Sequence, residues 1–225
     1  DFIILKEFGF REVGILQMAI FLGMIFRNTI SEIQNRMIFP LASAYQEDGE
    51  KLKELYVTSV NIALFIYLPS GFGIGFISAD LVTVLFDDEW FEVGQLLSIL
   101  AVAGVFGSLT RTIEQLYKGS GAAKEIFVFC LVSLFFLAYF AYFITDLSLL
   151  GVCQSILAAS IAHFLIITIH SWYKFGIGMG EFKITAPLIV SAAITMILVL
   201  AFVDNLDLVV GYQALFAKIV IGAIT

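Results

Sequence analysis

The stretch LPSGFGIGFISADLVTVLFDDEWFEVGQLLSILAVAGVF, residues 68–106, decides the fold. It contains two long apolar runs on either side of a short acidic break at residues 87–92. A bilayer hydrocarbon core about 30 Å thick needs about 20 mostly apolar residues in each helix that crosses it. Both runs reach that length when the flanking sequence is added, so the stretch predicts two consecutive transmembrane helices.

The composition of the whole chain supports the same fold class. Of its 225 residues, 60% are hydrophobic and only 14% are charged, and the mean hydropathy is +1.00. Ordinary soluble domains are about 45–50% apolar and about 25% charged, so this chain has too few polar residues to cover a surface in water. The net charge of -7 argues against nucleic acid as a partner. We therefore predict an all-α integral membrane protein, an antiparallel bundle of about seven transmembrane helices.

Seven segments are long and apolar enough to cross a membrane. They cover residues 13–39, 57–85, 93–117, 125–145, 149–171, 184–203 and 208–225. All the breaks between them are short, which makes neighbouring helices antiparallel and predicts a single transmembrane domain over residues 1–225. Because the chain starts at Asp1 without a signal peptide and ends in an apolar run, we interpret it as a fragment of a longer protein.

Of the breaks between these segments, only alternate ones contain lysine, whereas Lys6 and Arg11, before the first segment, fall on the opposite side. The lysine-bearing breaks hold Lys51, Lys53, Lys118, Lys124, Lys174 and Lys183. The opposite breaks contain acidic residues and no lysine or arginine. Short loops rich in lysine and arginine stay on the cytoplasmic side of a membrane. The pattern predicts a multi-pass protein of the cytoplasmic membrane with the lysine-bearing breaks inside the cell.

Two segments, the first and the third, are too polar to face lipid on all sides. Their candidate cavity-lining residues are Arg27, Asn28, Glu32 and Arg36 in the first and Arg111 and Glu114 in the third. Ionisable side chains are costly in hydrocarbon and usually face a bundle interior or a water-filled cavity. The alternative for Arg36, near a helix end, and for Arg111 is that the side chain reaches the lipid headgroups at the interface. Glu32–Arg36 and Arg111–Glu114 also have the spacing of ion pairs on a helix.

The second segment carries a candidate hinge. Pro69 is followed by Gly71, Gly73 and Gly75 within the apolar run. Proline removes a backbone hydrogen bond and kinks a helix, whereas small residues also permit tight helix packing. We interpret Pro69, Gly71 and Gly73 as a hinge, and static packing remains the alternative.

Nothing in the sequence indicates a catalytic site, a metal site or a cofactor. The two cysteines, Cys130 and Cys153, lie in apolar runs without metal-ligand spacing. The two histidines, His163 and His170, share one face of a predicted helix, and for His163 we expect hydrogen bonding between helices. The chain also lacks the large hydrophilic loops that carry the chemistry of membrane-embedded enzymes.

Four stretches together resemble the Wzx-type polysaccharide flippases of the multidrug/oligosaccharidyl-lipid/polysaccharide exporter superfamily. They are GFREVGILQMA (9–19), RMIFPLASAYQEDGEKLKELY (36–56), residues 68–106 and LYKGSGAAKE (116–125). Asp87 stands where glycine is usual in the family's turn. The likeness covers about residues 9–125, and the rest resembles the family only by helix spacing. It implies a protein of 12 to 14 helices in two lobes, of which this chain is most of the second.

The resemblance also implies a function and partners. A flippase moves a lipid-linked oligosaccharide across the membrane by alternating access, next to membrane lipids and a missing N-terminal lobe, with Na⁺ or H⁺ as an open coupling ion. Arg27, Arg36 and Arg111 are then candidates to balance the diphosphate of the substrate. The first alternative is a cation-coupled drug or metabolite antiporter of the same superfamily. The second, from a different class, is a membrane-embedded glycan polymerase or other biosynthetic enzyme.

Overall fold

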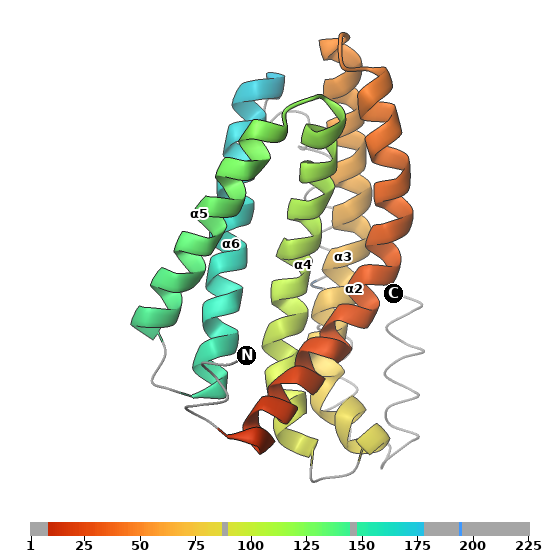
Figure 1. Ribbon diagram of the computed structural model, residues 1–225. Helices are drawn as coiled ribbons and strands as arrows, with labels where there is room; N and C mark the ends of the chain where they lie inside the picture. The colour runs from red at the N-terminus through yellow and green to blue at the C-terminus, as the bar shows by residue number, and fades with distance from the viewer. Residues whose placement is uncertain (1–8, 87–89, 145–147, 178–193, 195–225) are drawn as a thin grey trace.

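The computed structural model describes residues 9–86, 90–144, 148–177 and 194 of the chain (Figure 1). Every secondary-structure element in this part is an α-helix. The helices are α2 (Phe10–Ala44), α3 (Gly49–Phe86), α4 (Phe91–Gly119), α5 (Ala123–Ile144) and α6 (Leu149–Phe175). The predicted fold class, an all-helical membrane bundle, is confirmed for the described residues.

Four of these helices, α3 to α6, are long and apolar enough to cross a membrane. The first five predicted segments fall on α2 to α6. The predicted segments at 184–203 and 208–225 lie outside the described residues, so the total of seven spans stays a prediction. Helices α2 and α3 have 35 and 38 residues, which makes them about 52 and 57 Å long. Both therefore extend well beyond a hydrocarbon core of about 30 Å.

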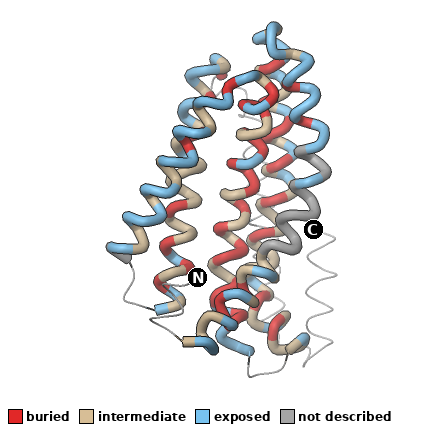
Figure 2. Tube along the Cα trace, viewed as in Figure 1, coloured by how far each residue is buried: buried red, intermediate tan, exposed pale blue. Residues whose placement is uncertain are grey.

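Helix α4 occupies the centre of the bundle and α5 lies at its edge (Figure 1). Helix α4 packs against α2, α3 and α6, whereas α5 packs chiefly against α6. Buried residues accordingly follow α4 along its length, and exposed ones cover most of α5 (Figure 2). The bundle is organised around α4, so any polar residue on α4 has to be placed against neighbouring helices or in an opening between them.

Two apolar clusters hold α4 to its neighbours, one near each end of the bundle. Towards the C-terminal end of α4, Ile113, Leu116 and Tyr117 pack with residues of α2, α3 and α6. Towards its N-terminal end, Leu96, Leu97 and Leu100 pack with a second group of residues from α2, α3 and α6. The α2, α3 and α6 residues of the two clusters are Ile38, Ala42, Leu52, Tyr56, Val60 and Ile167 at the first end and Ile15, Leu16, Ala19, Val82 and Cys153 at the second.

Glycines on α4 allow its neighbours to approach closely. A Cβ atom built on Gly94 would lie 2.7 Å from the Cα of Ala79 on α3. One built on Gly119 would lie 2.7 Å from the carbonyl oxygen of Phe39 on α2. Neither distance leaves room for a methyl group, so both contacts need glycine. Small residues at helix crossings are typical of membrane bundles.

One end of the bundle collects the lysines of the described residues, and we call it the lysine end. Here the α2–α3 connection, the α4–α5 connection and the last turn of α6 lie together (Figure 1). They carry Lys51, Lys53, Lys118, Lys124 and Lys174. The lysine-bearing breaks thus meet on one side, and Lys183 lies outside the described residues. Their assignment to the cytoplasm stays a prediction.

Candidate functional site

One line of residues along α4 is buried towards the N-terminal end of the helix and exposed towards its C-terminal end. Its members, spaced alternately three and four residues apart, are Leu97, Leu100, Gly104, Gly107, Arg111, Glu114 and Lys118. This spacing places them on one side of a helix, and we call them the α4 stripe. Leu97 and Leu100 are buried, whereas Arg111 and Lys118 are exposed and Glu114 is half-buried. The polar half of the stripe is open in a helix that is otherwise the most enclosed of the bundle.

The crossing of α2 explains the change along the stripe. A Cβ atom built on Gly23 of α2 would lie 3.6 Å from Leu97 and 3.8 Å from Leu100, so α2 covers the stripe there. Further along, α2 contacts α4 at Gly119, on a different side of the helix from the stripe. Figure 1 shows α2 passing across the lower part of α4 and diverging from it towards the upper part, where α3 stands between them in this view. The upper part of the stripe is therefore left uncovered by α2.

A small pocket lies where the covered and open halves of the stripe meet. Its volume is about 150 Å³. Its walls are Ile20 and Gly23 of α2, Leu100, Ala103 and Gly104 of α4, and Ile156 and Ser160 of α6. The Ser160 hydroxyl donates a 2.8 Å hydrogen bond to the carbonyl oxygen of Ile156. The proton of this hydroxyl is thus used within its own helix, and the other side chains that line the pocket are apolar.

The predicted residues of the third segment lie together on the stripe. Arg111 and Glu114 are one turn apart, and Lys118 follows one turn later. In the same turns, Thr110, Thr112 and Ile113 are buried. The Glu114 carboxylate therefore has a cation one turn away on each side, and both cations reach the surface. The open half of the stripe carries a net positive charge that an anionic group can approach.

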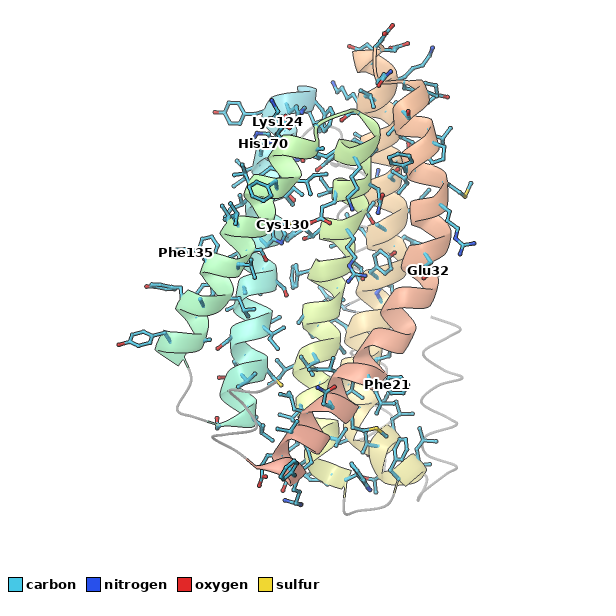
Figure 3. All side chains as sticks on the ribbon, in the orientation of Figure 1. Phe21, Glu32, Lys124, Cys130, Phe135 and His170 are labelled. Atoms are coloured by element: carbon cyan, nitrogen blue, oxygen red, sulfur yellow. The ribbon has the colours of Figure 1, made fainter. Side chains whose placement is uncertain are left out.

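The predicted residues of the first segment form a separate group on α2. Glu32 and Arg36 make an ion pair of 3.7 Å, and their side chains are 73% and 82% exposed. Figure 3 shows Glu32 on the outer side of α2. Ile38 and Ala42, which are buried, lie on a different face of α2 from Glu32 and Arg36. The side chains of Arg27 and Asn28 lie outside the described part of the structure, so their role in a cavity stays a prediction.

The candidate hinge on α3 lies inside a continuous helix. Pro69 falls within Gly49–Phe86, and the Ser70 hydroxyl donates a 2.6 Å hydrogen bond to the carbonyl oxygen of Ile66. Gly71 is buried against α4, where an added Cβ atom would collide with Val105. Close packing is therefore one role of Gly71. Bending at Pro69, Gly71 and Gly73 stays a prediction.

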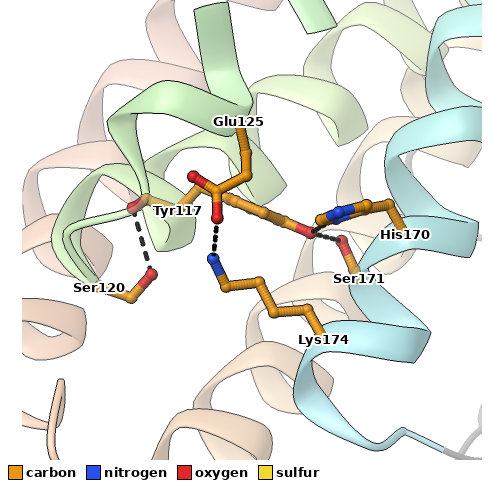
Figure 4. Close-up of polar contacts among 6 residues, drawn as sticks. All are labelled: Tyr117, Ser120, Glu125, His170, Ser171 and Lys174. Atoms are coloured by element: carbon orange, nitrogen blue, oxygen red, sulfur yellow. Dashed lines mark hydrogen bonds and ion pairs between the residues drawn. The ribbon is translucent and has the colours of Figure 1, made fainter. Parts of the chain in front are cut away.

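A group of polar contacts ties α4, α5 and α6 together at the lysine end (Figure 4). The hydroxyl of Tyr117 lies 2.7 Å from Nδ1 of His170 and accepts a 3.2 Å hydrogen bond from Ser171. Lys174 bonds Glu125 at 2.6 Å and lies 5.0 Å from the centre of the Tyr117 ring. We call these five residues the lysine-end clasp, and it fixes α6 against both α4 and α5.

The clasp adds to the expectation for the histidines. His170 makes a hydrogen bond between helices, whereas in the described residues Nε2 of His163 is buried without a hydrogen-bond partner. The shared face of the two histidines was visible in the sequence. Tyr117 was not recognisable as the partner, because it lies 53 residues before His170.

An open polar groove of about 760 Å³ lies next to the clasp. It is lined by the α2–α3 connection, by Ser120 and by the end of α6 at Lys174, Phe175 and Gly176. In that connection Asp48 binds the Lys51 ammonium at 3.0 Å. Hydrogen bonds from the side chain and the backbone of Lys51 hold the pKa of the Asp48 carboxyl below its usual value. This connection is therefore tied down at the start of α3.

Metal ligation finds no support in the residues that the structure describes. They contain no cluster of three or more histidine, cysteine, aspartate or glutamate side chains able to hold an ion. Cys153 is buried in the core, and Cys130 is exposed on α5. The open half of the α4 stripe and the pocket below it are thus the strongest candidate site in this part of the chain.

Comparisons with known proteins agree with this placement in the membrane. Residues 1–95 match the family model described as "Polysaccharide biosynthesis protein". An 87-residue segment is 29% identical to "Uncharacterized membrane protein in cps region" from Klebsiella pneumoniae, over 39% of this chain and 18% of that protein. A 100-residue segment is 25% identical to "Lipopolysaccharide biosynthesis protein WzxC" from Escherichia coli (strain K12), over 44% of this chain and 20% of that protein.

The aligned segments thus cover about a fifth of each relative's length, 18% and 20%. No solved structure matches the chain. The family model and both relatives concern membrane proteins or proteins of polysaccharide biosynthesis. They confirm the resemblance drawn from the sequence: over part of its length, this chain is similar to the Wzx-type polysaccharide biosynthesis proteins.

Proposed function

We propose that this chain is part of a transporter that moves lipid-linked oligosaccharide precursors across the cytoplasmic membrane by alternating access. The observation that carries the proposal is the open half of the α4 stripe. Arg111 and Lys118 are exposed there on the central helix of an apolar bundle. Arg111 lies about 12 Å inside the end of α4, and a cation at that depth is costly unless it meets water, an anion or a polar partner.

The substrate class explains why such a surface is useful. A sugar–diphosphate headgroup cannot cross hydrocarbon without a polar path, while its lipid tail can remain in the bilayer. Phosphate oxygens accept strong, charge-assisted hydrogen bonds from arginine. The similarity to proteins of polysaccharide biosynthesis supports this class of anion over other lipid anions. Arg111 would bind the diphosphate, and Lys118 would attract it from the lysine end.

The antiporter alternative would be favoured by a buried carboxylate without a neighbouring cation. Glu32 pairs with Arg36 on the surface of α2. Glu114 is half-buried and has Arg111 and Lys118 within one turn. Both acidic candidates therefore have cations close by, which disfavours them as sites for a coupling Na⁺ or H⁺.

Substitution of Arg111 in the intact protein tests the proposal. We expect Arg111→Ala to reduce translocation of a lipid-linked oligosaccharide in vesicles by more than tenfold, because hydrogen bonds to charged groups contribute about 1.5–3 kcal/mol. Arg111→Lys should retain part of the activity, since it keeps the charge but loses the planar fork.

Arg11→Ala is the matched control. Arg11 is also exposed, but it pairs with Glu92 at 3.8 Å near the opposite end of α4. The Arg11→Ala variant should translocate the lipid-linked oligosaccharide as fast as the unsubstituted protein. Unchanged translocation by Arg111→Ala at equal protein level would refute the proposed role of the stripe.

A further inference from the structure

The pocket beside the open half of the α4 stripe has features of a binding site for an apolar chain. It is a partly open pocket between three helices, α2, α4 and α6, and its volume is about 150 Å³. A closed apolar cavity of about this volume accepts a small hydrocarbon such as benzene. A segment of five or six carbons therefore fits the space.

The walls of the pocket are mainly apolar. Ser160 is the single hydroxyl-bearing side chain among the residues that line it, and that hydroxyl is bonded to Ile156 within α6. A polar group placed against these walls would find few partners, which is unfavourable. An apolar occupant would instead gain contacts with Ile20, Leu100 and Ile156.

The position of the pocket relates it to the cations above. Gly104 belongs both to the pocket and to the α4 stripe. Arg111 follows seven residues later, about 10 Å further along the helix, and Lys118 about 21 Å further. A ligand with an anionic head at Arg111 can therefore reach the pocket with the first part of an attached chain.

We propose that the pocket binds the segment of the substrate's lipid carrier next to the diphosphate. This inference rests on the function proposed above and deepens it. Arg111 holds the headgroup and the α2–α4–α6 pocket holds the start of the tail. The two contacts together select an anion that carries a long apolar chain over a free anion such as pyrophosphate.

The test measures the affinity of the intact, purified protein for two probes, inorganic pyrophosphate and farnesyl diphosphate. The first carries the headgroup charge alone, and the second adds a branched chain of 15 carbons. The unsubstituted protein should bind farnesyl diphosphate at least tenfold more tightly. Burial of even two carbon groups corresponds to about a tenfold gain in affinity.

Two substitutions at Ser160 separate the pocket from the rest of the site. Ser160→Leu fills the space. It should lower the affinity for farnesyl diphosphate about tenfold and leave the affinity for pyrophosphate unchanged. Ser160→Ala keeps the space open and should bind both probes normally. Gly23→Ala is a milder second filling variant, because its new methyl group meets Leu97 and Leu100 at ordinary contact distances of 3.6 and 3.8 Å. It should weaken only farnesyl diphosphate, by a smaller factor.

The possible failures are distinguishable. The unsubstituted protein could bind both probes with equal affinity while pyrophosphate binding still depends on Arg111. That result would overturn the proposed role of the pocket but leave the proposed function standing. Absence of any diphosphate binding would overturn both. The inference would also be contradicted if Ser160→Leu and Gly23→Ala each lost affinity for both probes to the same extent. So would displacement of farnesyl diphosphate by a diacyl phosphatidylcholine, since the pocket would then belong to bilayer lipid.

Discussion

Helices α4 and α5 have nearly the same hydropathy but opposite surroundings. Their most apolar windows have mean hydropathies of 1.8 and 2.1, yet 61% of the α4 window is buried inside the bundle and only 6% of the α5 window is. Hydropathy therefore identifies both as membrane helices without distinguishing the helix at the centre from the one at the edge. The two helices also differ in where they carry glycines and large exposed side chains.

Small residues mark α4 and large ones mark α5. Helix α4 has glycine at positions 94, 104, 107 and 119. At Gly94 and Gly119, α3 and α2 approach its backbone closely. Helix α5 instead exposes Phe127, Leu131, Leu134 and Phe135, and Figure 3 shows Phe135 pointing away from the bundle. Long apolar side chains suit a lipid-facing surface, whereas glycine suits contact between helices. Four predictions test this contrast, from the largest expected effect to the smallest.

Removal of a leucine side chain should matter on α4 and not on α5. Leu97 is 1% exposed and Leu134 is 63% exposed. Leu97→Ala should lower the free energy of unfolding by about 2–5 kcal/mol, because it leaves a cavity in the packed core. Leu134→Ala should change it by less than about 0.5 kcal/mol, as for other exposed sites. Denaturant titration of the protein in detergent measures both, and equal losses would show that α5 is packed against something.

Addition of a methyl group at a close helix contact should have the next largest effect. Gly119→Ala places a Cβ atom 2.7 Å from the carbonyl oxygen of Phe39, and overpacking of this kind costs about 1–3 kcal/mol. Gly14→Ala on α2 is the control, since nothing lies within 4 Å of its Cβ position. Thermal unfolding in the same detergent compares them. If both variants melt alike, the contact between α2 and α4 is looser than described.

The lysine-end clasp should contribute a smaller amount. Tyr117→Phe removes the hydroxyl that bonds His170 and Ser171, and we expect a loss of about 1 kcal/mol. Tyr173→Phe on the same end of α6 is the control, because Tyr173 is 90% exposed. The comparison uses denaturant titration as above. A larger effect from Tyr173→Phe would contradict the clasp.

The ion pair between α5 and α6 should have the smallest effect. Lys174 and Glu125 lie 2.6 Å apart, with side chains about one-third exposed at 29% and 35%. Pairs near a surface contribute about 0.2–1 kcal/mol. A double-mutant cycle of Lys174→Gln and Glu125→Gln measures the coupling between them. A value near zero would mean that α5 is held by apolar contacts with α6 alone.

Apolar run length was enough to predict the helices, because the bilayer fixes how many residues a span needs. Arg111 and Glu114 were also predictable as a pair, since their spacing alone places them one turn apart. The exposure of this half of the α4 stripe was not predictable. It depends on where α2 crosses α4, and the glycines that set the crossing, Gly23 and Gly119, have no recognisable pattern in sequence.

The pocket was missed for the same reason. Its walls come from three helices, and residues 20 and 160 lie far apart in the chain. The Tyr117–His170 bond likewise joins residues 53 positions apart. Periodicity reports which residues share one face of one helix. It does not report which helix that face meets.

The central claim is that the polar half of α4 faces water while the outer side of α5 faces lipid. Thiol labelling of the intact protein in a bilayer tests it most directly. Arg111 lies eight residues before the end of α4 at Gly119, and Leu131 lies eight residues after the start of α5 at Ala123. Both therefore lie about 12 Å from the lysine end of their helices.

Each position is replaced by cysteine in a protein whose native Cys130 and Cys153 are changed to alanine. The protein is then treated with a polar, membrane-impermeant maleimide from the lysine end. We expect rapid labelling of Arg111→Cys and almost none of Leu131→Cys. Labelling of Leu131→Cys with protection of Arg111→Cys would contradict the account.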